Sequence, residues 1–208
     1  MLRSMITARI RGGPIAVVLI LYGIASEVMF GPWPGLVGRV RERCEGLAAL
    51  DVRGFWSRQD AQSLVRACGP AGRNAYVNLQ LADVLYPAIA GSALLLVSAA
   101  LLHRYGPRMW PLLLPAIATT GLDYAENVAV WTLLLRWPRV DAAVASIGGP
   151  VSAAKQALGF VAVGVVFALL ALAAVRWVRS RRRGRESARR TEQAGPGNPQ
   201  RPTVPAGG

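Results

Sequence analysis

The chain has 208 residues, of which 53% are hydrophobic and only 17% are charged, and its formal net charge is +13. Soluble domains usually carry about 25% charged residues, so the composition argues against an ordinary soluble domain. The length suits one compact unit rather than two.

Four long apolar stretches follow one another along the chain, and we predict that each spans a membrane. They cover about residues 14–30, 81–102, 109–135 and 151–175. A span needs roughly 20 mostly apolar residues at about 1.5 Å of rise each, and the first stretch is short but can be extended at either end. Lipid cannot satisfy open backbone groups, so helices are required. We therefore predict an all-α integral membrane protein, a four-transmembrane-helix bundle in residues 14–178.

The positive charge is concentrated in three segments that fall on one side of such a bundle. These are the basic N-terminus (1–13), the link around Arg104 and Arg108, and the tail that begins beyond 178. Positively charged loops stay in the cytoplasm, so both termini are predicted there. The first outer loop, residues 31–80, also carries seven arginines, which weakens the contrast. The Arg-, Ala- and Gly-rich composition suggests a bacterial plasma membrane.

A cleaved signal peptide is the competing interpretation of the first stretch. The residues before it are basic, and the segment Gly23-Ile24-Ala25, with a small residue at each end, offers a cleavage site. No clear A-x-A pattern follows the apolar run, so we favour a retained span. Cleavage would leave three spans with the same sidedness.

The first outer loop has its own helical pattern. Apolar residues from Leu36 to Leu47 recur at helical spacing, which predicts an amphipathic helix on the membrane or on the bundle. Ser57 followed by Asp60 predicts a helix N-cap, and Gly69 with Pro70 predicts a helix stop. The polar segment 72–78 is either a lid over the membrane site, with Arg73 as a cation, or an interfacial anchor.

Cys44 and Cys68 are the only cysteines, and both lie in this loop. An oxidising compartment would favour a disulfide between them. The alternative is two unpaired apolar residues on helix faces. Because there is no C-x-x-C pair, a redox enzyme is a poorer interpretation.

The tail from 179 to 208 is predicted to be basic, disordered and cytoplasmic. Its arginines should attract anionic lipid headgroups, at about 1 kcal/mol for each residue near the surface. The lipid bilayer and these headgroups are the expected partners. Nucleic-acid binding is not expected, because the arginines are accounted for as a topology signal.

Four acids lie inside the predicted spans, namely Glu27, Asp83, Asp123 and Glu126. The direction of each helix places all four acids in the outer half of the bundle. Lys155 lies at the same level, near the outer start of the fourth helix. At 100° per residue Asp123, Glu126 and Asn127 share one face of the third helix. Charges at membrane depth are costly, so such residues usually face the bundle interior and pair.

Lys155 is the only lysine of the chain and the natural partner of these carboxylates, but it cannot neutralise four of them. At least one carboxyl is then protonated, hydrated or bound to a cation. The candidate ligand- or ion-binding residues are Asp123, Glu126, Asn127, Asp83, Lys155 and Glu27. No set of metal ligands is recognised, because His103 is the only histidine, and the cofactors are unknown.

Three functions remain open from the sequence. The first is a small binding or transport module for a proton, cation or cationic substrate, which would need a homo-oligomer for transport. The second is a membrane-embedded enzyme acting on a lipid or isoprenoid, with Glu126 or Asp123 as general acid or base. The third is a structural or assembly subunit, in which the polar groups hold helices together.

Overall fold

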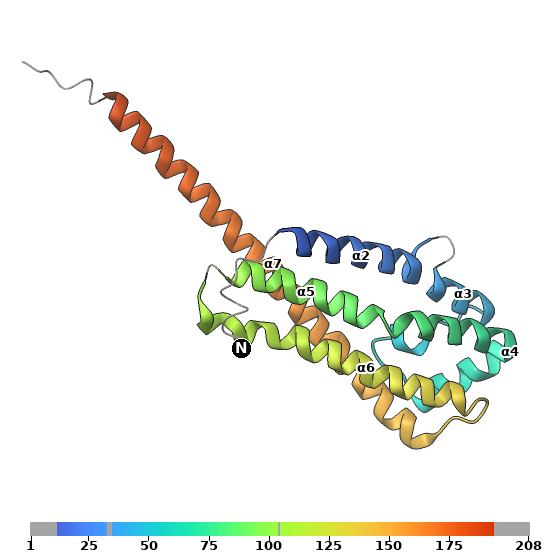
Figure 1. The fold of residues 1–208 in the computed structure, drawn as a ribbon. Helices are drawn as coiled ribbons and strands as arrows, with labels where there is room; N and C mark the ends of the chain where they lie inside the picture. Colours follow the sequence, from blue (N-terminus) through green and yellow to red (C-terminus); the bar gives the residue numbers. More distant parts are fainter. Residues whose placement is uncertain (1–11, 33–34, 104, 194–208) are drawn as a thin grey trace, which may run out of the picture. The chain divides into compact units, whose positions relative to one another are not determined.

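The computed structural model describes residues 12–32, 35–103 and 105–193, and every regular element among them is helical (Figure 1). The chain divides into two units, residues 1–169 and 170–208, and each is considered by itself. Residues 1–11 of the predicted basic N-terminus and the last 15 residues lie outside the described residues. The elements, in order, are α2 (Gly12–Phe30), α3 (Leu36–Arg43), η1 (Leu50–Val52), α4 (Arg58–Asp83), α5 (Tyr86–Leu102), η2 (Pro107–Leu113), α6 (Leu114–Leu135) and α7 (Ala142–Gln193).

Three helical stretches of the described chain are long and apolar enough to cross a membrane. They are Gly13–Phe30, Arg58–Leu102, which joins α4 to α5, and Ala142–Glu186. The third predicted span, 109–135, corresponds to α6, which is not one of these three stretches; it is 22 residues long and contains Asp123 and Glu126. The all-helical class is therefore confirmed, together with three helices of membrane-spanning character.

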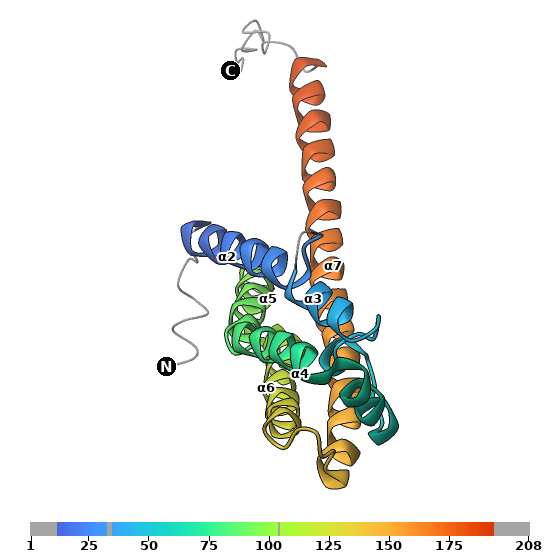
Figure 2. The same ribbon diagram turned by 90° about the vertical axis from the view of Figure 1, so that its right-hand side faces the viewer.

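The spanning helices expose their apolar side chains instead of burying them. α2 lies along α5, and α5 lies along α6 (Figures 1 and 2). Ile20 on α2 and Phe160 on α7 are more than 60% exposed, as are Leu85 and Val128. Contiguous exposed apolar surface of this kind is rare on soluble monomers and fits a lipid surrounding.

The main hydrophobic core instead lies in the predicted outer loop and against the C-terminal half of α6. Trp56, Leu64 and Leu79 are almost completely buried there, and Val130 and Leu134 of α6 complete the cluster. A disulfide joins Cys44, just after α3, to Cys68 of α4. This region is therefore a packed helical subdomain held by a covalent link.

The start of α4 confirms the predicted cap, and its interior confirms that a helical segment stops at Gly69. The Ser57 hydroxyl accepts a hydrogen bond from the Asp60 amide, and the Asp60 carboxylate accepts from the Ser57 amide, a complete capping box. At Gly69 the backbone adopts a φ of 55°, which glycine tolerates without penalty. Pro70 then starts a new helical segment. α4 thus consists of two helical segments with a kink between them, and the first segment ends at Gly69.

Several predicted boundaries differ from the observed ones. Residues 81–83 finish α4, and the second apolar stretch becomes α5 from Tyr86. Residues 107–113 form η2, so α6 begins at Leu114 with Pro115 in its first turn, where a missing amide proton costs little. α7 begins at Ala142, earlier than the predicted 151, because Asp141 accepts hydrogen bonds from the amides of Ala143 and Val144.

The second unit continues as helix to Gln193, whereas the sequence pattern predicts disorder from 179. Arginine, alanine and glutamate are strong helix formers, which accounts for the difference. The Arg181 guanidinium lies 4.0 Å from the centre of the Trp177 ring, one turn earlier. Residues 194–208 of the predicted tail are outside the described part of the chain.

Candidate functional site

Lys155 is at the centre of the candidate site. Its ammonium group lies 3.1 Å from Asp123 Oδ1 and forms an ion pair with Glu126 as well. It also donates a hydrogen bond of 3.1 Å to the backbone carbonyl of Asp51. The helical spacing of the two acids on α6 explains why both reach one lysine on α7.

Glu126 is completely buried, and a tryptophan from the outer region covers it. The indole Nε1 of Trp56 donates a long hydrogen bond of 3.4 Å to Glu126 Oε1. Gly148 and Gly149 of α7 make room for Trp56, since a Cβ on either would overlap the ring or its backbone carbonyl. Trp56 therefore covers the Glu126 side of the site and contacts both α6 and α7.

Asp51 is a member of the site that the sequence analysis missed. Its carboxylate accepts hydrogen bonds of 2.9 Å from the Tyr76 hydroxyl and 3.0 Å from Gln80 Nε2. The Leu50 amide donates to the same Tyr76 hydroxyl, which fixes the short helix η1 against α4. Burial raises the pKa of the Asp51 carboxyl, and the hydrogen bond from Tyr76 opposes that shift.

A sequence signal for this part of the site did exist. Tyr76, Gln80 and Asp83 recur at helical spacing in a segment whose other residues, apart from Asn78, are apolar, and all three are buried. A polar stripe at this spacing indicates a buried partner elsewhere in the chain. The spacing gave no indication that the partner was a loop aspartate.

Asp83 and Asn127 tie α4 to α6. The Asn127 side chain donates a 3.0 Å hydrogen bond to the Asp83 backbone carbonyl, and both residues are buried. Asn127 Oδ1 and Gln80 Oε1 are buried acceptors without a hydrogen-bond partner among the described residues. Buried polar atoms in proteins are nearly always satisfied, so unused acceptors indicate a place for a donor.

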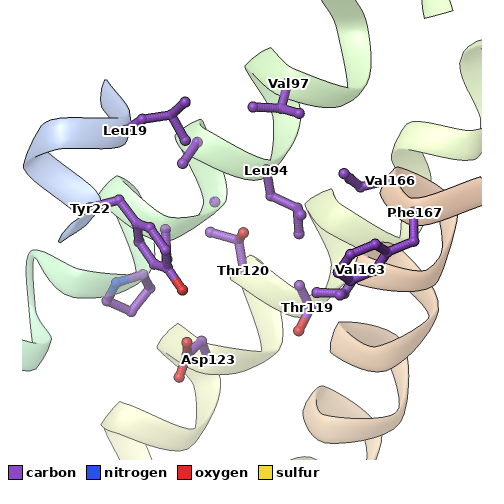
Figure 3. A pocket seen from close by; sticks show the side chains of 14 residues that line it. Leu19, Tyr22, Leu94, Val97, Thr119, Thr120, Asp123, Val163, Val166 and Phe167 are labelled. Atoms are coloured by element: carbon purple, nitrogen blue, oxygen red, sulfur yellow. The ribbon is translucent and has the colours of Figure 1, made fainter. Parts of the chain in front are cut away.

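A cavity of about 400 Å³ opens beside the ion pairs, among α2, α5, α6 and α7 (Figure 3). Its walls are mainly apolar, with Leu94 and Val97 from α5 and Val166 and Phe167 from α7. Asp123 contributes its carboxylate below Thr119 and Thr120, and Tyr22 of α2 points toward the same space (Figure 3). Small-molecule sites typically occupy about 300–1,000 Å³ and combine an apolar lining with a few polar groups.

Two further predicted residues lie outside this arrangement. Glu27 is exposed on α2, and among the described residues it forms no ion pair. Arg73 donates hydrogen bonds of 3.1 and 2.8 Å to the Leu134 carbonyl and so anchors α4 to the end of α6. The structure thus brings Asp123, Glu126 and Lys155 together and joins Asp83 to Asn127, with Asp51, Trp56, Tyr76 and Gln80 as additions.

Within the described ranges, no three His, Cys, Asp or Glu side chains are arranged to hold a metal ion. Comparison with protein-family models, with curated proteins and with solved structures finds no match for this chain. The function has to be inferred from the chemistry of the residues themselves.

Proposed function

We propose that the chain is a multi-pass protein of the plasma membrane with both termini in the cytoplasm. In this arrangement α2, α5, α6 and α7 form a four-helix bundle, and residues 31–80 form an outer helical subdomain. Support comes from the three apolar stretches and from α6, whose 22 residues exceed the roughly 20 that a span requires. The buried position of Glu126 and Asn127 is what lipid requires of polar residues in such a helix.

Within this bundle, the proposed activity is to bind a ligand that carries positive charge or donates protons. The observation that carries the proposal is the imbalance around Lys155, a single ammonium group shared by Asp123 and Glu126. With all three ionised, the group has one negative charge in excess. An excess charge in a largely buried group is expensive; a bound cation would balance it, and a bound hydrogen-bond donor would lower its cost.

The competing function is structural, because the same residues also hold helices together. The Thr119 hydroxyl donates to the Lys155 carbonyl at 2.9 Å, and Asn127 donates to Asp83 across α4 and α6. Such hydrogen bonds join membrane helices at a typical gain of about 0.6 to 2 kcal/mol each. An assembly subunit would need no ligand at all.

The thermal stability of Asp123→Asn in detergent at neutral pH separates the two functions. A ligand site holds its excess charge at a cost to stability. Because the substitution leaves Lys155 with Glu126 alone and removes the excess, the variant should melt at or above the wild-type temperature. Glu42→Gln, at an exposed position on α3, is the matched control. Markedly earlier melting of Asp123→Asn would instead favour the structural function.

A further inference from the structure

The cavity beside Asp123 has one polar end and a long apolar remainder. The side chains from α5 and α7 that line it are aliphatic or aromatic, and the helices around it expose apolar residues on their outer surfaces. A ligand that fills this space must be largely apolar and can enter from lipid. A small hydrated ion would leave most of the cavity without contacts.

The polar end offers mainly acceptors, and the Tyr22 hydroxyl is, among the described lining residues, the one further group that can donate as well as accept. The Thr119 hydroxyl proton is used on the Lys155 carbonyl, and the Thr120 proton is used on the Ala116 carbonyl at 2.8 Å. Both hydroxyl oxygens keep lone pairs, and the Asp123 carboxylate accepts only. The head of a matching ligand must therefore donate hydrogen bonds.

The charge of the site further restricts the chemical class of the ligand's head group. Glu126 is completely buried, whereas the Asp123 side chain is 22% exposed and lines the cavity. The carboxylate that remains accessible is thus the one beside the apolar space. A cationic head placed there would balance the negative charge that Lys155 leaves over.

We propose that the ligand is an amphiphile with a primary ammonium head and an apolar tail. The head donates to Asp123 and to the threonine oxygens, and the tail lies between α5 and α7. This inference rests on the proposed function, since it names the class of cation that the site takes. An uncharged hydroxyl head has one proton, so it could donate to only one of these acceptors, and it would leave the charge unbalanced.

The test uses the full-length protein in nanodiscs of zwitterionic lipid. A photoreactive alkylammonium is crosslinked to the protein in the presence of unlabelled competitors. Three competitors have the same chain length and differ in the head group: an alkylammonium, an alkyl alcohol and an alkyl carboxylate. The fourth, methylammonium, has the cationic head but no tail. We expect the alkylammonium to compete at least roughly ten-fold better than the alcohol, the carboxylate or methylammonium.

Two variants of α5 test the place of the tail. Ala90 lines the cavity, whereas Ala88 on the same helix is exposed and does not. Ala90→Phe should weaken alkylammonium competition by roughly ten-fold or more, and Ala88→Phe should leave it unchanged. Because the two variants add the same side chain to one helix, a difference between them is not a general effect of bulk. Crosslinked peptides should come from α5 and α7.

The outcomes separate this inference from the proposed function. If methylammonium competes as well as the alkylammonium, or if Ala90→Phe binds like the wild type, the site takes a cation without a tail and the inference is wrong. If the alcohol competes equally well, the head is not required to be cationic and the inference is wrong in that respect. If no amine competes and Asp123→Asn melts early, both proposals fail.

Discussion

The packed subdomain of residues 35–80 and the long apolar helices place their apolar side chains in opposite ways. In residues 31–80 apolar side chains such as Leu64 face inward, are almost completely buried and are supplemented by a disulfide. Along α2 the apolar side chains face outward, and Ile20 is 62% exposed. The first region stabilises itself by packing, as soluble domains do, whereas the second depends on its surroundings. The candidate site lies where the two regions meet.

The strongest test of this comparison is Trp56→Ala. Trp56 is completely buried, and it contacts Gly148, Gly149 and Glu126. Its loss should destabilise the protein by about 3–5 kcal/mol, the usual range for a buried tryptophan. Phe55→Ala, at a neighbouring aromatic residue that is 59% exposed, should cost far less. Thermal unfolding in detergent measures both, and equal losses would mean that Trp56 is not part of a packed core.

Removal of the disulfide should have the next largest effect. Cys44 and Cys68 are 24 residues apart, and a crosslink over such a loop typically contributes about 2–4 kcal/mol. The Cys44→Ser/Cys68→Ser variant should unfold at lower temperature than the wild type. Reductant should lower the wild-type melting temperature toward that of the variant and leave the variant unchanged. A reductant effect on the variant would show that the treatment acts elsewhere.

A smaller effect is expected from Asp51, and it depends on pH. Because burial raises the pKa of this carboxyl, the folded protein keeps the proton at pH values where the unfolded chain has released it. Stability should therefore fall as pH rises from the ordinary range of an aspartate through the raised pKa. Asp51→Asn should flatten that slope, and Glu42→Gln should not. Melting temperatures across a pH series measure the slope, and an unchanged slope in Asp51→Asn would contradict the assignment.

The smallest effect should come from the exposed face of α2. Ile20→Ala leaves no cavity, so its cost should stay within about 0.5 kcal/mol. Leu64→Ala removes a residue that is 1% exposed and should cost about 2–5 kcal/mol. The two variants thus compare the loss of a large aliphatic side chain on α2 with the same loss in the packed subdomain. Similar costs at both positions would mean that α2 is packed against protein and would weaken the contrast.

The sequence predicts regular and periodic features well. Apolar length identified three helices that are long and apolar enough to cross a membrane, and the Ser57–Asp60 spacing identified the start of α4. Helical spacing also put Asp123 and Glu126 on one face, and in the structure both contact Lys155. Each of these predictions succeeded because it depends only on residues that are close together along one helix.

Contacts between distant segments could not be read from the sequence. Asp51 looks like any solvated loop acid until Tyr76 and Gln80 are seen to surround it. The cavity likewise needs four helices in place before its volume exists. Gly69 and Pro70 mark the break inside α4, but their pattern does not indicate that a second helical segment starts at once at Pro70.

The position of the only lysine of the chain also makes chemical labelling selective. Lys155 is ion-paired and only 16% exposed, so amine reagents should reach it slowly. Apart from the α-amino group, no other amine competes for such a reagent. The labelling rate of one side chain is thus a direct readout of whether the acidic site is closed, filled or open, without knowledge of the natural ligand.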